Sequence, residues 1–395
     1  MKRFFFPVLA FAAIAVGCTK SGVVDLPQSL QTPIEFEPYS GKAPITKAEI
    51  ADLTTIQAEG SGIHVTGYVE GADNAIPASA SVYMDKDVTY SATNTKWGYE
   101  GASYWPETGT LSFVAYGLNA GNHFQPTTTG SKTNFTFTVP EDVTEQVDLL
   151  VSPRIKGQSI AKPTVSVRLY HLLSRVSFAV QTNNLATEDA VKVLIKNVTL
   201  NGSFVNKGTV DLTADHMKDP NNAEDEGYLC IEPSATSDDV TTVYSLFDSE
   251  YDGTNPSGDF PGFMTGNTKA ADGTNTPVDI YKSMTFTAGG DYPAFTTPGT
   301  AEDHYMMIMP GQVGNIDGKA PYIEVIYQLT DADEQVAKIP LTMVGENDVE
   351  SNWIFEAGKA YRFVFTVSTT AIGFTVEVDP WEELANSTHT LVPEA

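Results

Sequence analysis

Cysteine is nearly absent from this chain of 395 residues, which contains only Cys18 and Cys230. Because a disulfide needs two thiols, no intrachain disulfide can form if Cys18 is modified. Cys230 stands in the apolar stretch GYLCIEP, which is typical of a small buried hydrophobic residue. The fold must then depend on packed cores, for which a hydrophobic content of 41% and an aromatic content of 10% provide the material.

Basic residues are also few, with 23 Lys+Arg against 50 Asp+Glu and a formal net charge of −27. A chain this acidic is repelled by nucleic acid phosphates and by anionic lipid surfaces, so we expect no nucleic-acid partner. The excess of carboxylates is typical of a well-solvated surface. The length allows about two or three domains at roughly 100–200 residues each.

Long apolar runs are absent beyond the start of the chain. The run Phe4 to Val16 follows a positively charged start and is too short to cross a membrane as a stable helix, so it predicts a signal peptide at residues 1–17. Residues 15–18, Ala-Val-Gly-Cys, are similar to a bacterial lipoprotein cleavage box, in which the cysteine is acylated and becomes the new N-terminus. The alternative is an ordinary secretory signal in which Cys18 stands by chance.

Helical periodicity is nearly absent, whereas apolar and polar residues alternate repeatedly along the chain. Alternating segments separated by Gly, Pro, Asn and Asp predict strands at residues 62–70, 79–84, 110–117, 134–140, 147–152, 175–182, 191–202, 227–233, 241–247, 283–289, 305–311, 322–330, 337–343 and 360–381. This pattern predicts an all-β fold of sandwiches or barrels and argues against a βαβ fold.

A polar stretch at residues 154–164 is the expected boundary between two domains. We expect an N-terminal segment at residues 18–47 and an N-terminal β-sandwich domain at residues 48–160. A C-terminal β-sandwich domain is expected at residues 161–395, including a terminal strand and a tail.

Motifs for catalysis and metal binding are missing. The six histidines form no H-E-x-x-H pair and no zinc spacing with cysteine, and no G-x-S-x-G elbow occurs. Acidic residues crowd the loop at 215–226, but their spacing lacks the order of an EF-hand, which favours a solvated loop over a calcium site. Paired carboxylates for glycoside chemistry depend on spatial separation and stay open. We expect no catalytic residues, no cofactor and no metal site.

Two features could have a binding role. His171 lies in LYHLLSRV, where a packed, hydrogen-bonded histidine is expected more than a ligand position. Trp97, Tyr99, Tyr104 and Trp105 could form a sugar-binding platform. Large rings with a polar edge pack more often at the margin of a core, which is the role we expect for them.

One isolated strand signal lies between the early cysteine and the first domain. Residues 34–37, Ile-Glu-Phe-Glu, alternate between apolar and acidic side chains, and Gly and Pro follow. Lys47 comes next, within ITKAEI, and trypsin-like proteases cut after such a residue. A single strand candidate thus stands between a predicted lipid anchor and the body, followed by a cleavable site.

Four motifs in this order resemble the fimbrillin family, the lipoprotein pilins of Bacteroides- and Porphyromonas-type bacteria. WGYEGASYWPETGTLSFVAYG at 97–117 is similar to a W-x-Y…Y-W-P…L-x-F-x-A-Y signature, and VDLLVSP at 147–153 is similar to a D-L-L segment. YHLLSRVSFAV at 170–180 resembles an H-x-L-S-K/R strand. The stretch 357–381, AGKAYRFVFTV followed by FTVEVDPW, resembles the closing strand pair.

The resemblance extends over nearly the whole chain after the signal peptide. It implies two tandem β-sandwich domains of transthyretin-like or Greek-key type. The residues that carry it are Trp97, Tyr104, Trp105, Pro106, His171 and Trp381.

The resemblance also implies a mechanism of assembly. Similar proteins travel outward as lipoproteins, and a trypsin-like protease then cuts after a basic residue in the N-terminal segment. The cut releases the first strand and opens an apolar groove, which a C-terminal strand of the next subunit fills by strand addition. An unfilled groove exposes a strand edge, so filling it drives assembly without nucleotide hydrolysis.

On this sequence, the removable strand corresponds to the segment around Ile34 and Phe36, with both side chains facing inward. Lys47 takes the position of protease cleavage, where arginine is commoner in the family, and Lys42 is a second candidate. A solvated linker lysine is the alternative role for Lys47.

The C-terminal end is ambiguous. Ile372, Phe374, Val376 and Val378 alternate on one face, as a donated strand needs, and they suit the last strand of the body equally well. The tail at 382–395 has little apolar alternation, which favours a tip subunit that only receives a strand.

The sequence therefore predicts a fimbrial subunit, minor or at the tip, that contributes to cell adhesion. Its expected partners are other fimbrial subunits through strand exchange, the outer membrane through a lipid such as palmitate on Cys18, and a host or bacterial surface ligand. The expected location is the lipid-anchored cell surface and the fimbrium. The alternative is a monomeric surface lipoprotein that binds glycans or host proteins, and a secreted hydrolase is the weakest hypothesis.

Overall fold

The computed structural model describes residues 32–40, 62–77, 80–118, 124–126, 133–183, 192–213, 231–247, 259–260, 262–270, 272–281, 284–287, 294–296, 305–329, 332–344, 350–368, 372–380 and 388–389. These residues form strands and connecting turns, with one short 3₁₀ turn, η2 (Ala72–Asn74), and no α-helix among them. The expected all-β class is therefore confirmed. Within the described part of the chain, no helix has the length and apolar character needed to span a bilayer.

The largest sheet lies in the N-terminal part of the molecule. Its strands follow the order β1 (Glu35–Ser40), β10 (Thr164–His171), β8 (Leu150–Val151), β5 (Leu111–Leu118), β2 (Gly62–Val69), β3 (Val82–Ser91) and β4 (Lys96–Gly98), and β9 (Ile155–Gln158) also pairs with β5. β1 runs parallel to β10, whereas the other pairs are antiparallel. The first strand of the chain is thus held by a strand that follows it by more than a hundred residues.

Two further sheets build the C-terminal part. One has the order β18 (Val278–Asp279), β11 (Ser174–Thr182), β28 (Lys359–Val367), β29 (Ile372–Pro380) and β30 (Thr388–His389), with β21 (Tyr305–Ile308) also on β11. The other has the order β15 (Val240–Ser245), β12 (Val193–Val205), β23 (Tyr322–Leu329) and β24 (Gln335–Pro340), with β17 (Phe263–Thr265) on β12. β11 and β28 pair in parallel, as β1 and β10 do.

Smaller sheets complete the described structure. The four-stranded sheet contains β14 (Ile231–Pro233), β13 (Lys207–Asp211), β7 (Asn134–Thr138) and β6 (Phe124–Pro126). The remaining pairings join β16 (Asp259–Phe260), β19 (Met284–Thr287) and β20 (Ala294–Thr296), then β22 (Gly311–Gln312) with β27 (Ile354–Phe355), and β25 (Thr342–Val344) with β26 (Glu350–Asn352).

The sheets do not separate at the expected boundary near residue 160. β10 follows this position but lies in the sheet of β1, β5 and β2. β7 precedes it but pairs with β13. Several sheets of this kind are consistent with β-sandwich domains, and the division into two tandem domains stays a prediction.

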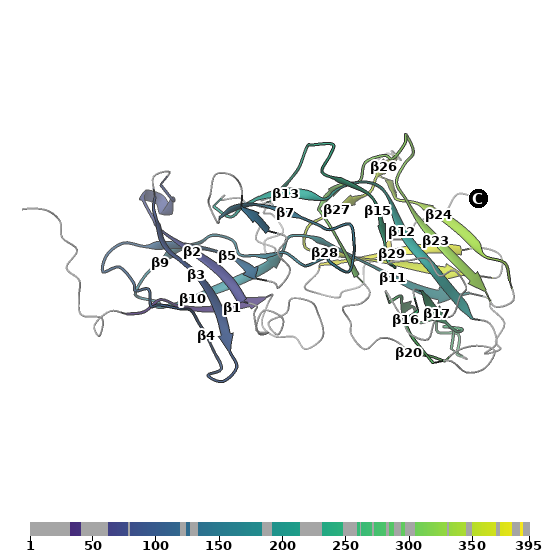
Figure 1. Ribbon diagram of the computed structural model, residues 1–395, viewed down its shortest axis with the longest axis horizontal. Coiled ribbons are helices and arrows are strands. Elements are labelled where there is room, and N and C mark those ends of the chain that lie inside the picture. Colours follow the sequence, from purple (N-terminus) through teal and green to yellow (C-terminus); the bar gives the residue numbers. More distant parts are fainter. Residues whose placement is uncertain are drawn as a thin grey trace, which may run out of the picture.

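Alternation of side chains explains why these segments form strands. In β23 the residues Ile323, Val325 and Tyr327 are buried, while the residues between them are half-buried. Successive side chains of a strand point to opposite faces, so this pattern puts one face of the sheet against a core. Figure 1 shows an elongated molecule, with β1 to β5, β9 and β10 towards one end and β12, β23, β28 and β29 towards the other.

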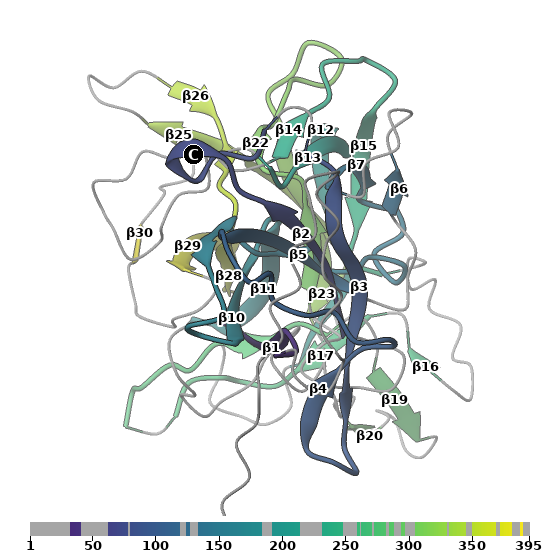
Figure 2. The same cartoon turned by 90° about the vertical axis from the view of Figure 1, so that its left-hand side faces the viewer.

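Two apolar cores hold the molecule together. The larger joins buried side chains of β7, β11, β12, β13, β23 and β28, with Phe178 and Phe365 stacked at a centroid distance of 5.7 Å. The smaller lies under β1 and contains Ile34 and Phe36 together with Trp105 and Phe113. Figure 2, viewed from the N-terminal end, shows β1 beside β10 at the margin of its sheet. The smaller core is therefore the one to which the first strand belongs.

Candidate functional site

β1 is hydrogen-bonded on two sides at its start. On one side it pairs with β10 from Glu35 opposite Thr164 to Ser40 opposite Leu169. On the other side the backbone N–H of Ile34 donates to the carbonyl of Ser103 at 2.9 Å. The strand thus bridges β10 and the segment that follows β4, and its removal would leave both partners without these bonds.

The side chains of β1 alternate between the core and the solvent. Ile34 is 1% exposed and Phe36 is 5% exposed, and Pro38 is also buried, whereas Glu35 and Glu37 are exposed. Burying one side chain of this size stabilises a fold by about 1.5–3 kcal/mol. The two large apolar residues of β1 therefore hold the strand in place, and the carboxylates keep its outer face solvated.

Aromatic rings form the walls around Phe36. Its ring meets Phe113 edge-on at 5.4 Å between centroids and lies 5.9 Å from the ring of Tyr99. The ring of Trp105 also meets Phe113 edge-on, at 5.9 Å between centroids. Gly67 makes room for this cluster, because a Cβ there would lie 2.8 Å from the Phe113 ring. Without β1, these rings would line an apolar groove.

Two hydrogen bonds from aromatic side chains fix the groove. The Tyr99 hydroxyl donates to the backbone carbonyl of Ile34 at 2.7 Å, and the Trp105 indole donates to the carbonyl of Pro163 at 3.1 Å. Burial is the main cause that raises the pKa of Tyr99, so this hydroxyl keeps its proton as a donor. Tyr99 holds β1 directly, while Trp105 fixes the turn that leads into β10.

The remaining residues of the W-x-Y…Y-W-P segment surround the same place. Trp97 packs against the smaller core and meets the ring of Tyr90 at 5.4 Å. The carbonyl of Tyr104 accepts a hydrogen bond from the Tyr83 hydroxyl at 2.7 Å, and Pro106 is half-buried after Trp105. The segment from β4 to Pro106 thus encloses β1.

The opposite end of the chain supplies β29, which contains Ile372, Phe374, Val376 and Val378. β29 pairs with β28 from Ile372 opposite Val367 to Pro380 opposite Lys359. Val376 is fully buried. On its other side β29 pairs with β30, through Val376 opposite His389. In this structure β29 therefore lies between β28 and β30 in the sheet that also contains β11 and β18.

An ion-pair network connects β29 to its neighbours. The Arg362 guanidinium contacts Asp279 of β18 at 2.7 Å and Glu377 of β29 at 3.0 Å. These carboxylates raise the pKa of Arg362 against the opposing effect of burial, which keeps it charged. One arginine therefore joins β18, β28 and β29.

Five residues singled out in the sequence lie outside the described residues. They are Cys18, the expected lipidation site; Lys47 and Lys42, the expected cleavage sites; Cys230, the expected buried thiol; and Trp381, the end of the closing motif.

Comparison with known proteins identifies the family. The family model described as fimbrillin-like matches residues 46–381. The chain belongs to the fimbrillin-like family.

Three of the solved structures that match this chain come from Bacteroides species. A fimbrial protein from Bacteroides vulgatus has 14% sequence identity and a TM-score of 0.49, covering 88% of this chain and 99% of its own. A protein from Bacteroides uniformis, described as a cell adhesion protein, has 13% identity and a TM-score of 0.45, covering 90% of this chain and 100% of its own. A counterpart from Bacteroides ovatus, described in the same way, has 14% identity and a TM-score of 0.42, covering 89% of this chain and 98% of its own. No curated protein matches the sequence.

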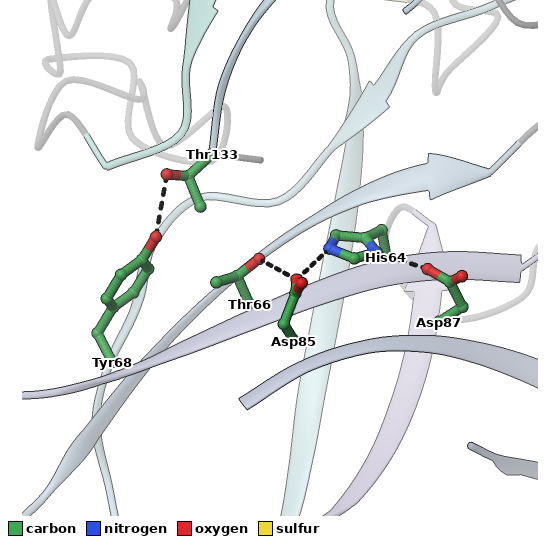
Figure 3. Close-up of polar contacts among 6 residues, drawn as sticks. All are labelled: His64, Thr66, Tyr68, Asp85, Asp87 and Thr133. Carbon is green, nitrogen blue, oxygen red and sulfur yellow. Dashed lines mark hydrogen bonds and ion pairs between the residues drawn. The ribbon is translucent and has the colours of Figure 1, made fainter. Parts of the chain in front are cut away.

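This fimbrillin-like protein also has a polar cluster that motif analysis does not reveal. His64 of β2 is 2% exposed, and its Nδ1 lies 2.5 Å from an Asp87 carboxylate oxygen and its Nε2 lies 2.6 Å from one of Asp85 (Figure 3). The hydroxyl of Thr66 also donates to Asp85 at 3.3 Å. The ring of Tyr116 covers the histidine at 5.0 Å.

The His64 cluster lies on the face of β2 opposite the groove. Ile63 and Val65 face the smaller core, whereas Tyr68, on the face of His64, donates or accepts a hydrogen bond with Thr133 at 3.0 Å (Figure 3). The sequence signal is the spacing of Asp85 and Asp87, which puts both carboxylates on one face of β3. In the described part of the chain, no group of three or more His, Cys, Asp and Glu could hold a metal ion.

His171 of this fimbrillin-like protein lies where the first sheet passes into the second. Its Nδ1 is 2.6 Å from a carboxylate oxygen of Asp148, and both side chains are buried. Leu172 follows and donates its N–H to the carbonyl of Leu149 at 2.9 Å, after which β11 begins at Ser174. This arrangement gives His171 the contacts of a packed, hydrogen-bonded residue.

Proposed function

We propose that this protein is a fimbrial subunit whose first strand is a removable plug, and that proteolysis followed by donor-strand exchange assembles it. Family membership supports the broader part of the proposal, which is a cell-surface protein that acts with other fimbrial subunits in adhesion. The proposal of strand removal and exchange rests on the packing of β1. The strand fills an apolar groove whose walls come from residues distant in the sequence, among them Phe113 and Val165.

The chain between β1 and β2 contains the expected cleavage sites. β1 ends at Ser40 and β2 begins at Gly62, so a cut after Lys42 or Lys47 separates the first strand from the body. After such a cut only non-covalent contacts hold β1. The groove then favours a strand that presents apolar side chains at the places of Ile34 and Phe36.

The pairing of β29 supports the proposed position in the fibre. β29 pairs with β28 along its length and is joined to Arg362 through Glu377, which supports a role as a retained strand. A subunit that keeps this strand and has a polar tail receives a strand better than it donates one. We therefore assign the protein to a minor or tip position rather than to the stalk.

The location in this proposal is the outer membrane and the fimbrium. Acylation of Cys18 would anchor the protein until the cut releases it from its N-terminal segment. Stable anchoring needs two lipid chains, or one chain with a second attraction to the membrane. One cysteine that carries more than one acyl chain therefore suffices. The proposed role is structural and adhesive, without catalysis.

Limited proteolysis tests the proposal. The purified protein is treated with a low dose of trypsin, and a labelled peptide with the sequence of residues 32–40, TPIEFEPYS, is added in excess. We expect loss of the segment that ends at Lys47, followed by SDS-resistant ladders or, for a tip subunit, by capture of the peptide. A body that is cut after Lys47 and neither forms ladders nor captures the peptide contradicts strand exchange. A peptide with its apolar and acidic positions exchanged is the control.

A disulfide between β1 and β10 provides the matched variant. Glu37 and Ser166 are opposite one another in the parallel pair, and both are exposed. Glu37→Cys with Ser166→Cys, in a Cys230→Ser background, should keep β1 in the groove after the cut, and a reducing agent should then release it. Equal peptide capture by the oxidised and reduced forms would mean that the peptide binds elsewhere.

The alternative function is a monomeric surface lipoprotein that binds glycans or host proteins. It predicts a body that remains monomeric after the cut and retains its ligand-binding activity. Electrophoresis of the trypsin-treated protein distinguishes the two functions.

A further inference from the structure

A small pocket opens at one end of the β23–β24 pair, in the C-terminal part of the molecule. Its volume is about 260 Å³, and it is lined by Lys319, Ala320, Pro321, Tyr322, Lys338 and Pro340. Pockets for drug-sized ligands usually have about 300–1,000 Å³, so this one suits a single ring-sized ligand. None of these residues contributes to the groove of β1.

The walls of the pocket are fixed by backbone contacts. Leu341 donates its N–H to the carbonyl of Pro321 at 2.8 Å, and Tyr322 pairs with Pro340. Lys319 and Ile316 exchange hydrogen bonds of 2.9 and 3.0 Å around a tight turn. A ligand would therefore meet a pre-formed surface, which lowers the entropic cost of binding.

Two lysines are among the residues that line the pocket. Lys338 contacts Glu324 at 2.9 Å and lies 4.8 Å above the ring of Tyr322, so its charge is partly balanced. Lys319 is exposed and has no side-chain partner among the residues that the structure describes. In a chain with a net charge of −27, an unpaired cation beside a pocket favours an anionic ligand.

The sheet face next to the pocket is polar and ordered. Asn201 and Thr199 of β12 stand opposite Tyr322 and Glu324 of β23. The Asn201 amide donates to the Thr199 hydroxyl at 2.8 Å, and the Ser245 hydroxyl donates to Asn197 at 3.0 Å. Asn201 itself is buried, whereas Asn197, Thr199 and Ser245 are half-buried. The accessible amide and hydroxyl groups of these three match the hydroxyl groups of a sugar.

Addition of a peptide strand at this place is disfavoured. β24 is the outer strand of its sheet among the described residues, and its outward residues include Lys338 and Pro340. Lysine and proline on an outer strand hinder pairing with another strand, because proline lacks an N–H and lysine keeps water around the edge. A compact ligand fits the pocket better than an extended one.

We propose that this pocket and the adjoining sheet face bind a carboxylate-bearing sugar, with the carboxylate at Lys319 and the ring against Tyr322 and Pro340. Binding is a property of one subunit and does not depend on strand exchange. The inference can therefore fail while the proposed assembly holds, and the reverse is also true.

Two sugars that differ in one group test the inference. Methyl β-glucuronide and methyl β-glucoside have the same ring, and only the first has a carboxylate. Titration of the purified protein, followed by calorimetry and ligand-observed NMR, should give roughly two- to fivefold tighter binding of the glucuronide, as expected for an exposed ion pair. Added salt should reduce this difference. Equal binding of both sugars, or no binding of either, would overturn the inference.

Variants locate the site. Lys319→Gln should remove the preference for the glucuronide, and Tyr322→Ala should weaken the binding of both sugars. Lys269→Gln, at another exposed lysine, is the matched control and should change neither. A preference that survives Lys319→Gln, or an acidic dipeptide that binds as well as the glucuronide, would contradict a sugar site here. Thermal unfolding verifies that each variant is folded.

Discussion

The hydroxyl of Tyr99 donates a 2.7 Å hydrogen bond to the backbone carbonyl of Ile34, and so joins the groove to the strand that fills it. The ring of the same residue packs against Phe36 at 5.9 Å. Tyr99 therefore holds β1 in two ways, through a polar contact with the backbone and an apolar contact with a side chain. The two contributions can be separated by substitution.

Tyr99→Phe should loosen β1 without emptying the groove. The change keeps the ring and removes one hydrogen bond, which costs about 0.5–1.5 kcal/mol. We expect faster hydrogen exchange in residues 35–40 and faster tryptic release of the first strand. Tyr90→Phe, where the ring packs on Trp97, is the control. If the rate of hydrogen exchange in β1 is the same in both variants, the hydroxyl of Tyr99 does not hold the strand.

Phe36→Asp should weaken β1 far more. The substitution removes an apolar side chain that is 5% exposed and puts a carboxylate among aromatic rings, so the lost burial alone amounts to about 1.5–3 kcal/mol. We expect early loss of the first strand and premature assembly or peptide capture, seen on the gel without trypsin. Glu37→Ala, on the exposed face of the same strand, should behave like the parent. A Phe36→Asp protein that stays as stable and monomeric as the parent would mean that β1 is not held by this side chain.

The sequence predicts the strands with clean alternation and misses relations that depend on register. β23 and β7 lie within the predicted segments, because one side of each strand is apolar and the other polar. β10 has no counterpart among the predicted strands, although Val165, Val167 and Leu169 alternate in it. The polar stretch at residues 154–164 is typical of a linker. The sequence therefore gives no sign that β10, the strand that pairs with β1, begins at its end.

The parallel pairing of β1 with β10 could not be predicted from the sequence. Side-chain periodicity gives the faces of each strand but not the identity of its neighbour, and here the partners are far apart in the chain. The same reason hides the His64 cluster, since Asp85 and Asp87 reach the ring only in the observed register of β2 and β3.

The His64 cluster should contribute to the stability of the first sheet. His64→Asn removes contacts at both ring nitrogens, and hydrogen bonds to charged groups are worth about 1.5–3 kcal/mol each before solvent screening is considered. We expect a loss of about 1–3 kcal/mol in the free energy of unfolding. Asp85→Asn should cost more than Asp87→Asn, because the side chain of Asp85 is 34% exposed and that of Asp87 is 64% exposed. The reverse order in denaturant titrations would contradict this ranking.

Alkaline pH should destabilise the same region through Tyr116. Burial, and next to it the carboxylates of Asp87 and Asp85, raises the pKa of Tyr116 from 10.0 to about 12. A raised pKa gives stability that is present below about pH 10 and is lost as the pH rises through about 12. The free energy of unfolding should thus fall with pH in this window, and less steeply in Tyr116→Phe. An identical slope in both proteins would assign the loss to other buried tyrosines, such as Tyr244.

A disulfide between β28 and β29 should leave assembly unchanged if β29 stays in its own subunit. Thr366 and Gly373 are opposite one another in the pair, and a Cβ at Gly373 would lie in open space, so cysteines can be introduced at both positions without a clash. In a Cys230→Ser background, we expect the oxidised variant to give the same products as its parent after trypsin treatment, whether ladders or captured peptide. Ladders that form only after reduction would show that β29 is donated, because a locked strand cannot leave its sheet. The single variant Gly373→Cys controls for the effect of the side chain itself.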